Sequence, residues 1–167
     1  MTGAERRSVV VIGIGNVVCS DDGLGVHAIR RLGERRRQSD GVELIEGGTA
    51  GLMLLPHLAD ARRAIIVDAI SVGASPGTLV RLERVEDVFA TGMTAHDVGL
   101  ADLLDALRLT DSWPDELVLH GAQPASTDLG TELTQRLATA LPGLLDAIEA
   151  ELASWCRAET ESSQPCA

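Results

Sequence analysis

The sequence predicts an α/β protein, a three-layer α/β/α sandwich around a twisted, mostly parallel sheet of about five strands. Apolar runs of strand type alternate along the chain with stretches of helical period. The strand-like runs are apolar throughout, which is typical of parallel strands buried on both faces. A length of 167 residues with 45% hydrophobic residues suits one domain with a full core.

Five segments are expected to form the strands of the sheet. Each is rich in β-branched and aliphatic residues and is followed by turn residues or a polar segment. The five segments are Ser8–Ile14, Val42–Ile45, Ala64–Val67, Thr78–Leu82 and Leu117–Leu119. The fourth segment follows the turn sequence SPG, so it is open to an antiparallel position at the edge of the sheet.

Four segments between and after the strands are expected to be helical. The first, Asp22–Arg37, has apolar residues on one face, acids at its start and arginines at its end, which agrees with the helix dipole. The others are residues 51–60, residues 97–109 and Thr131–Cys156, with Pro142 as the place for a kink in the last. We expect a single α/β domain over residues 1–156 and a disordered tail over residues 157–167.

The charge balance argues against nucleic acid as a partner. The chain has 14 basic and 25 acidic residues, a formal net charge of −11, and only 2% aromatic residues. It therefore lacks both the basic stripe and the stacking side chains that nucleic-acid binding uses.

Cysteine usage and hydropathy predict a cytoplasmic location without membrane insertion. Three cysteines, an odd number without CxxC spacing, do not form a disulfide framework. The apolar run near the N-terminus is too short and too glycine-rich for a signal peptide, and no long apolar span follows.

The segment from Val9 to Gly25, VVVIGIGNVVCSDDGLG, is the most informative part of the chain. Gly13 and Gly15 allow a tight turn after the first strand, and Asn16 tolerates left-handed backbone geometry. Asp21 and Asp22 should then lie at the carboxyl end of that strand, which is where open α/β sheets place their sites.

A dinucleotide site is the commonest alternative for such a glycine turn. The fingerprint GxGxxG is incomplete here, because its third glycine position holds Val18. Asp21 and Asp22 would also repel a pyrophosphate. We therefore expect no nucleotide cofactor.

A better candidate site combines the polar residues that follow different strands. Asp22 follows the first strand, Asp68 ends the third, and His96 precedes a helix. Two carboxylates and an imidazole make an open oxygen, oxygen, nitrogen set for a divalent transition metal. The simpler alternatives are that Asp22 is a helix N-terminal acid, that Asp68 closes a strand and that His96 caps its helix.

Other polar residues have simpler interpretations. His27 is expected to be solvated, and His57 and His120 to be packing residues rather than ligands. Cys19 near a helix start is a candidate thiolate, but the neighbouring acids oppose its ionisation. Glu46 either belongs to a strand-to-helix turn or is an additional acid at the site.

Four sequence pieces together resemble one known family. They are GIGNVVCSDDGLG, EGGTAG, VDAI followed by SPGT, and TAHDVGLADLLDALRL, in this order. This arrangement resembles the hydrogenase maturation endopeptidases, which process the large subunit of nickel–iron hydrogenases. The resemblance runs from about Val9 to the last helix.

The resemblance implies a fold, an activity and a partner. It implies a phosphorylase/hydrolase-like α/β fold and an endopeptidase of aspartic type or metal-dependent type, acting as a monomer. The substrate would be the hydrogenase large-subunit precursor, whose C-terminal extension is removed after nickel insertion. Nickel would come with the substrate rather than as a resident cofactor.

The resemblance also assigns roles to residues. Asp22 and Asp68 would be catalytic, and with His96 they would contact the metal. The residues that shape the cleft would be Gly13, Gly15, Asn16, Gly47 and Gly48.

Two other functions stay open from the sequence. One is a non-catalytic accessory protein of the same fold that binds nickel or a nucleotide. The other is a hydrolase of related fold that acts on a different protein.

Overall fold

The computed structural model describes residues 7–36, 41–83 and 98–162, and its centre is a five-stranded sheet. The strands are β1 (Arg7–Ile14), β2 (Val42–Gly48), β3 (Ala61–Ala69), β4 (Leu79–Leu82) and β5 (Glu116–Ala122). Their order in the sheet is β2-β1-β3-β5-β4. All neighbouring pairs are parallel except β4 and β5, so β4 is the antiparallel edge strand that the SPG turn suggested.

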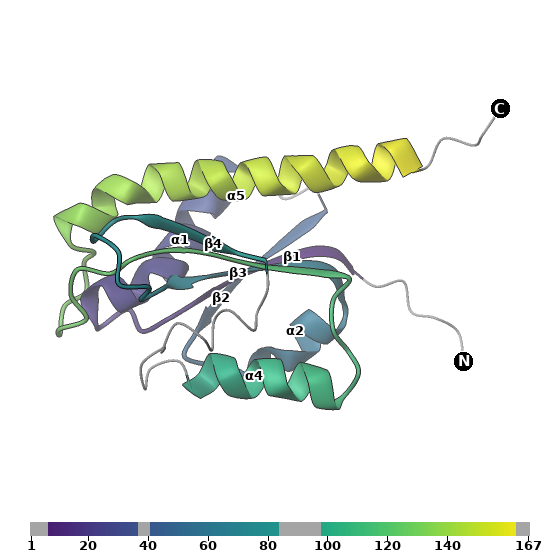
Figure 1. The fold of residues 1–167 in the computed structure, drawn as a ribbon, viewed down its shortest axis with the longest axis horizontal. Helices are drawn as coiled ribbons and strands as arrows, with labels where there is room; N and C mark the ends of the chain where they lie inside the picture. Colours follow the sequence, from purple (N-terminus) through teal and green to yellow (C-terminus); the bar gives the residue numbers. More distant parts are fainter. Residues whose placement is uncertain (1–6, 37–40, 84–97, 163–167) are drawn as a thin grey trace.

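Helices cover both faces of the sheet. They are η1 (Ser20–Gly23), α1 (Leu24–Arg35), η2 (Gly51–Leu54), α2 (Leu55–Ala59), α4 (Val98–Leu109) and α5 (Gln135–Ser162). Helices α1 and α5 lie on one face, and α2 and α4 lie on the other (Figure 1). The predicted three-layer α/β/α class is therefore confirmed.

The centres of the strands are largely apolar because both faces of the sheet are buried. In β1, Val9 and Val11 pack into the cluster under α1 and α5, whereas Val10 and Ile12 pack into the cluster under α2 and α4. Successive side chains of a strand point to opposite faces, so a strand between two helical layers needs apolar residues at every position.

The last helix differs from its prediction. We expected it to end near Cys156, with a disordered tail from Arg157, but α5 continues to Ser162 and passes Pro142 without interruption. Two contacts hold this part of α5 on the sheet. The Trp155 side chain is buried, and Arg63 Nη1 donates a hydrogen bond to the Trp155 backbone carbonyl oxygen at 3.1 Å. Residues 163–167 lie outside the described residues. None of the helices that the structure describes combines the length and the apolar character of a membrane span.

The parallel strands give the sheet two distinct edges. At the carboxyl edge, on the left in Figure 1, lie the loop after β1, the segment after β2, the loop after β5 and the start of α4. At the opposite, amino edge lie the starts of the parallel strands and the loop between α4 and β5. Binding sites of open α/β sheets lie at the carboxyl edge.

Candidate functional site

The turn after β1 brings helix α1 very close to the sheet. A Cβ atom on Gly13 would lie 2.1 Å from the Gly25 carbonyl oxygen, and a Cβ on Gly25 would lie 2.2 Å from the Val67 carbonyl oxygen. Only glycine permits this approach. The start of α1, and the η1 turn before it, are thereby fixed over the ends of β1 and β3.

Asp22 lies in η1 and is half-buried. Its Oδ2 atom accepts a hydrogen bond from the Asn16 backbone amide at 2.8 Å. Among the described residues, Oδ1 has no hydrogen-bond partner. The amide orients the carboxylate without neutralising it, and one oxygen keeps its lone pairs for a ligand or a water molecule.

Asp68 lies at the end of β3 and is 6% exposed. Its Oδ1 atom accepts a hydrogen bond from the Ala69 amide at 2.7 Å. A Cβ on Gly15 would lie 3.5 Å from this oxygen and 1.8 Å from the Asp22 carbonyl oxygen. Gly15, at φ 119°, therefore lies between the two acids, and the structure brings Asp22 and Asp68 to the same point of the carboxyl edge.

The third predicted ligand, His96, lies outside the described residues. Helix α4, which follows it in sequence, begins beside η2, where a Cβ on Gly51 would lie 3.7 Å from the Gly99 Cα. Within residues 7–36, 41–83 and 98–162, no three His, Cys, Asp or Glu side chains form a metal-binding group. The described part of the chain thus contains two of the three predicted metal contacts, Asp22 and Asp68.

Asp21 has a structural role that the sequence did not reveal. It is fully buried and accepts hydrogen bonds from the amides of Ala125, Ser126 and Thr134 at 2.8, 3.2 and 2.7 Å. The Thr134 hydroxyl donates a fourth bond at 2.9 Å. Asp21 therefore ties the loop between β5 and α5 to the turn that carries Asp22, whereas we had expected both acids to face the site.

The other residues predicted to shape the cleft also lie at this edge. Asn16 does not use a left-handed backbone; its Oδ1 accepts a bond from the Val18 amide at 3.1 Å, and the positive φ angles fall on Gly15 and Ser20. A Cβ on Gly47 would lie 2.9 Å from Ile12 Cγ2, so Gly47 permits tight packing, while Gly48 has open space around it.

A small pocket lies at the carboxyl edge next to Gly15, although neither Asp22 nor Asp68 lines it. Its volume is about 200 Å³, and its lining includes Gly15, Asn16 and Gly48. Glu46 also lines it and pairs with Arg30 at 3.0 Å, with both side chains about half exposed. Glu46 is therefore an acid at this edge, but an arginine already neutralises it.

The histidines and cysteines of the described chain do not join this site. His57 is partly exposed near Glu43, and His120 is 2% exposed on β5. His27 was expected to be solvated, but its Nε2 atom is buried without a hydrogen-bond partner. Cys19 and Cys156 form no disulfide within the described residues.

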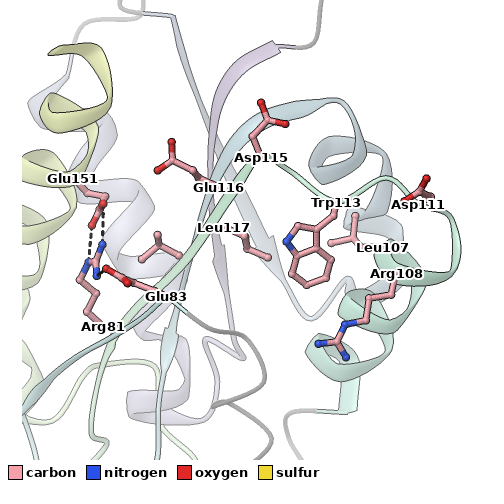
Figure 2. Close-up of a pocket in the computed structure, with 11 residues that line it drawn as sticks. Arg81, Glu83, Leu107, Arg108, Asp111, Trp113, Asp115, Glu116, Leu117 and Glu151 are labelled. Carbon is pink, nitrogen blue, oxygen red and sulfur yellow. Dashed lines mark hydrogen bonds and ion pairs between the residues drawn. The ribbon is translucent and has the colours of Figure 1, made fainter. Parts of the chain in front are cut away.

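A larger cavity, of about 700 Å³, lies at the opposite part of the molecule (Figure 2). Its wall is formed by residues of β4, β5, α5 and the loop after α4, including Trp113 and Glu116. Several of its charged groups pair with one another: Arg81 donates to both carboxylate oxygens of Glu151, at 2.7 and 3.0 Å. This cavity lies at the start of β5, at the amino edge, away from Asp22 and Asp68, so its size does not mark the candidate site.

His120 lies next to this pair, with its Nε2 atom 3.3 Å from Glu151. Burial lowers the pKa of His120, although Glu151 opposes that effect. The hydrogen bonds from Arg81 lower the pKa of Glu151. These groups form a neutral histidine beside an ion pair, which packs α5 onto β4 and β5.

Comparison with known proteins gives one consistent result. The family model described as hydrogenase maturation protease matches residues 26–151. The hydrogenase 2 maturation protease of Escherichia coli is 37% identical over 86% of this chain and 90% of its own length.

A second relative and a solved structure agree with this result. The hydrogenase expression/formation protein HupM of Azotobacter chroococcum is 40% identical over 81% of this chain, which spans 66% of that relative. The structure of the hydrogenase maturating endopeptidase HYBD from E. coli has a TM-score of 0.79 and 35% identity, and the match covers 87% of this chain and 92% of that chain.

Proposed function

Because the chain belongs to the hydrogenase maturation protease family, we propose that it is the endopeptidase that removes the C-terminal extension of a nickel–iron hydrogenase large-subunit precursor. The observation that carries this proposal is that the Asp22 backbone carbonyl and the Asp68 carboxylate both lie close to Gly15 at the carboxyl edge. Two carboxylates at one point can bind a cation and can also accept a proton from water.

In this proposal, nickel is part of the substrate. Asp22, Asp68 and His96 contact the ion that the precursor already holds. A precursor without nickel leaves these polar groups without their partner and binds less well. Cleavage is therefore restricted to precursors that have received the metal.

We assign the proton transfer to Asp22. Its Oδ1 atom has no hydrogen-bond partner among the described residues, and its side chain is more accessible than that of Asp68. As general base it takes a proton from water as the water attacks the scissile carbonyl, and it returns that proton to the leaving amine. Asp68, the deeper carboxylate, assists hydrolysis through its contact with the ion.

We also place the protein in the reducing cytoplasm. Its three cysteines, an odd number without CxxC spacing, suit that compartment.

The test is intact-mass spectrometry of the precursor after anaerobic incubation with this protein. The precursor is supplied with and without nickel. Loss of one C-terminal peptide from the nickel-loaded form alone is the expected result. Cleavage of both forms would contradict the metal requirement, and an unaltered precursor in a stable complex would favour the accessory-protein alternative.

A further inference from the structure

Exposed apolar side chains are unevenly distributed over the two edges of the sheet. Among the described residues, the exposed large hydrophobic side chains are Val18, Leu52, Met53, Leu79, Leu109 and Leu129. Four of these, Val18, Leu52, Met53 and Leu129, lie in the segments that follow strands at the carboxyl edge. Leu109 instead ends α4, next to the loop that leads into β5 at the amino edge.

Val18 and Leu129 lie side by side. A parallel bridge joins Cys19 to Gly130, and the Gly130 amide donates to the Val18 carbonyl oxygen at 3.0 Å. Because Val18 and Leu129 each precede the bridge by one residue, they are neighbours in register. Val18 is 49% exposed and Leu129 is 89% exposed, so together they form an apolar contact surface, here called the docking pair.

The docking pair is held rigidly. The Ser20 amide donates to the Gly130 carbonyl oxygen at 2.7 Å, and the Ser20 hydroxyl donates to the Asp128 carbonyl oxygen at 2.8 Å. The carboxylate of Asp21 fixes the same loop by accepting four hydrogen bonds from residues 125, 126 and 134. The backbone on both sides of Leu129 is therefore fixed in a position that leaves its side chain exposed to water.

The docking pair is also continuous with the candidate site. Ser20 and Asp21, which anchor the loop, immediately precede Asp22 in η1. Any protein that places a peptide bond at Asp22 must lie across this edge. Apolar side chains that pass from water into an interface favour binding, because their surface is removed from water.

We propose that Val18 and Leu129 bind an apolar surface on the folded body of the large-subunit precursor, next to the extension that is cut. This inference rests on the proposed function, because it takes the partner from it. The contact is separate from the nickel contact, so it contributes to binding whether or not the precursor holds the metal. It positions the precursor and takes no part in bond breaking.

The experiment compares Leu129→Ser with Leu109→Ser, two leucines of 89% and 88% exposure at opposite edges. KM and kcat are measured with nickel-loaded precursor, and Kd is measured with nickel-free precursor, which is not cut. We expect Leu129→Ser to raise KM and Kd about tenfold, with kcat unchanged, and Leu109→Ser to change none of them. Val18→Ser, a second variant in the same pair, should raise the same two constants.

Three results would overturn one or both proposals. Unchanged KM and Kd in Leu129→Ser, or an equal rise in Leu109→Ser, would overturn the docking inference while leaving the protease function intact. Absence of cleavage by the wild type, with binding still weakened by Leu129→Ser, would overturn the protease function alone. Absence of both cleavage and binding would overturn both.

Discussion

The acids of η1 at the carboxyl edge are held differently from the acids at the amino edge. Asp21 and Asp22 accept hydrogen bonds from backbone amides, which are neutral donors, whereas Glu46 near them pairs with Arg30. At the amino edge and in its cavity, carboxylates pair with arginines: Asp115 with Arg62, Glu116 with Arg63, and Glu151 with Arg81.

The difference explains why the larger cavity is not the proposed site. An amide orients a carboxylate but leaves its charge in place, so the carboxylate can still bind a cation or accept a proton. An arginine neutralises that charge and occupies its oxygens. The candidate site at the carboxyl edge, where backbone amides bind the carboxylates of Asp22 and Asp68, is therefore the one suited to metal contact and hydrolysis.

The largest expected effect comes from removing the charge of Asp22. Asp22→Asn should lower the rate of precursor cleavage about 10³-fold, because an amide cannot accept the proton from water. Single-turnover cleavage of nickel-loaded precursor measures this. Asp115→Asn is the matched control at the amino edge, where the acid is exposed and paired, and it should leave the rate unchanged. Normal cleavage by Asp22→Asn would refute the assignment.

The next effect concerns stability and tests the anchoring role of Asp21. Asp21→Ala should lower the free energy of unfolding by about 3 kcal/mol, because three amides and a hydroxyl of the loop lose a buried, charged acceptor. Urea denaturation measures this change. Asp128→Ala, which removes an exposed acid of the same loop, should change stability by no more than about 0.5 kcal/mol. Equal losses in the two variants would show that Asp21 is not the anchor.

A smaller effect compares two glycines. Gly15→Ala should cost about 2 kcal/mol and reduce cleavage, because its φ is 119° and its Cβ would meet the Asp22 carbonyl oxygen. Gly33→Ala, inside α1 with open space around it, should gain up to about 1 kcal/mol. Thermal unfolding of both variants measures the contrast, and a stable, active Gly15→Ala would contradict the close approach seen in the turn.

The smallest effect is a pH dependence of stability from the His120 region. Burial lowers the pKa of His120 in the folded chain below 6.5, its ordinary value in the unfolded chain. At a pH between the folded and the unfolded pKa, the unfolded chain binds a proton that the folded chain does not. Stability should therefore fall as the pH drops below about 6.5, by no more than about 1.4 kcal/mol per pH unit from this group.

Glu151 adds a second, more acidic step in the same direction. Because Arg81 lowers its pKa, its contribution is present above about pH 4.5 and is lost as the pH falls further. Urea denaturation at pH 7.5 and 5.5 tests the histidine, and His120→Gln should flatten the slope between them. An unchanged slope in His120→Gln would mean that another group titrates.

Much of the fold was predictable from local pattern. The centres of β1 and β3, residues 9–12 and 64–67, are apolar at every position, which is typical of a sheet covered on both faces. Their lengths were underestimated, since β3 begins at Ala61 and ends at Ala69 although polar residues interrupt the apolar run. Helix α5 was also placed too short, because the contact of Arg63 with its C-terminal part is not visible in the helix's own sequence.

The candidate site was predictable only in part. Asp22 and Asp68 could be placed at one edge because parallel strands end together, and the structure brings them together around Gly15. The assignment of His96 stays a prediction, because that residue lies outside the described part of the chain. Leu129 had no local signal at all, since a lone leucine in a polar loop is equally compatible with a core contact.

By itself, the sequence determined the fold class, the order of strands and turns along the chain, and the acidic character of the carboxyl edge. These features depend on periodicity and on residue type. Only the tertiary structure decided which of two adjacent, chemically identical acids is buried and which is accessible. Asp21 and Asp22 differ by the direction of one side chain on a short helical turn, and that direction is set by amides of residues 125–134, far away in the chain.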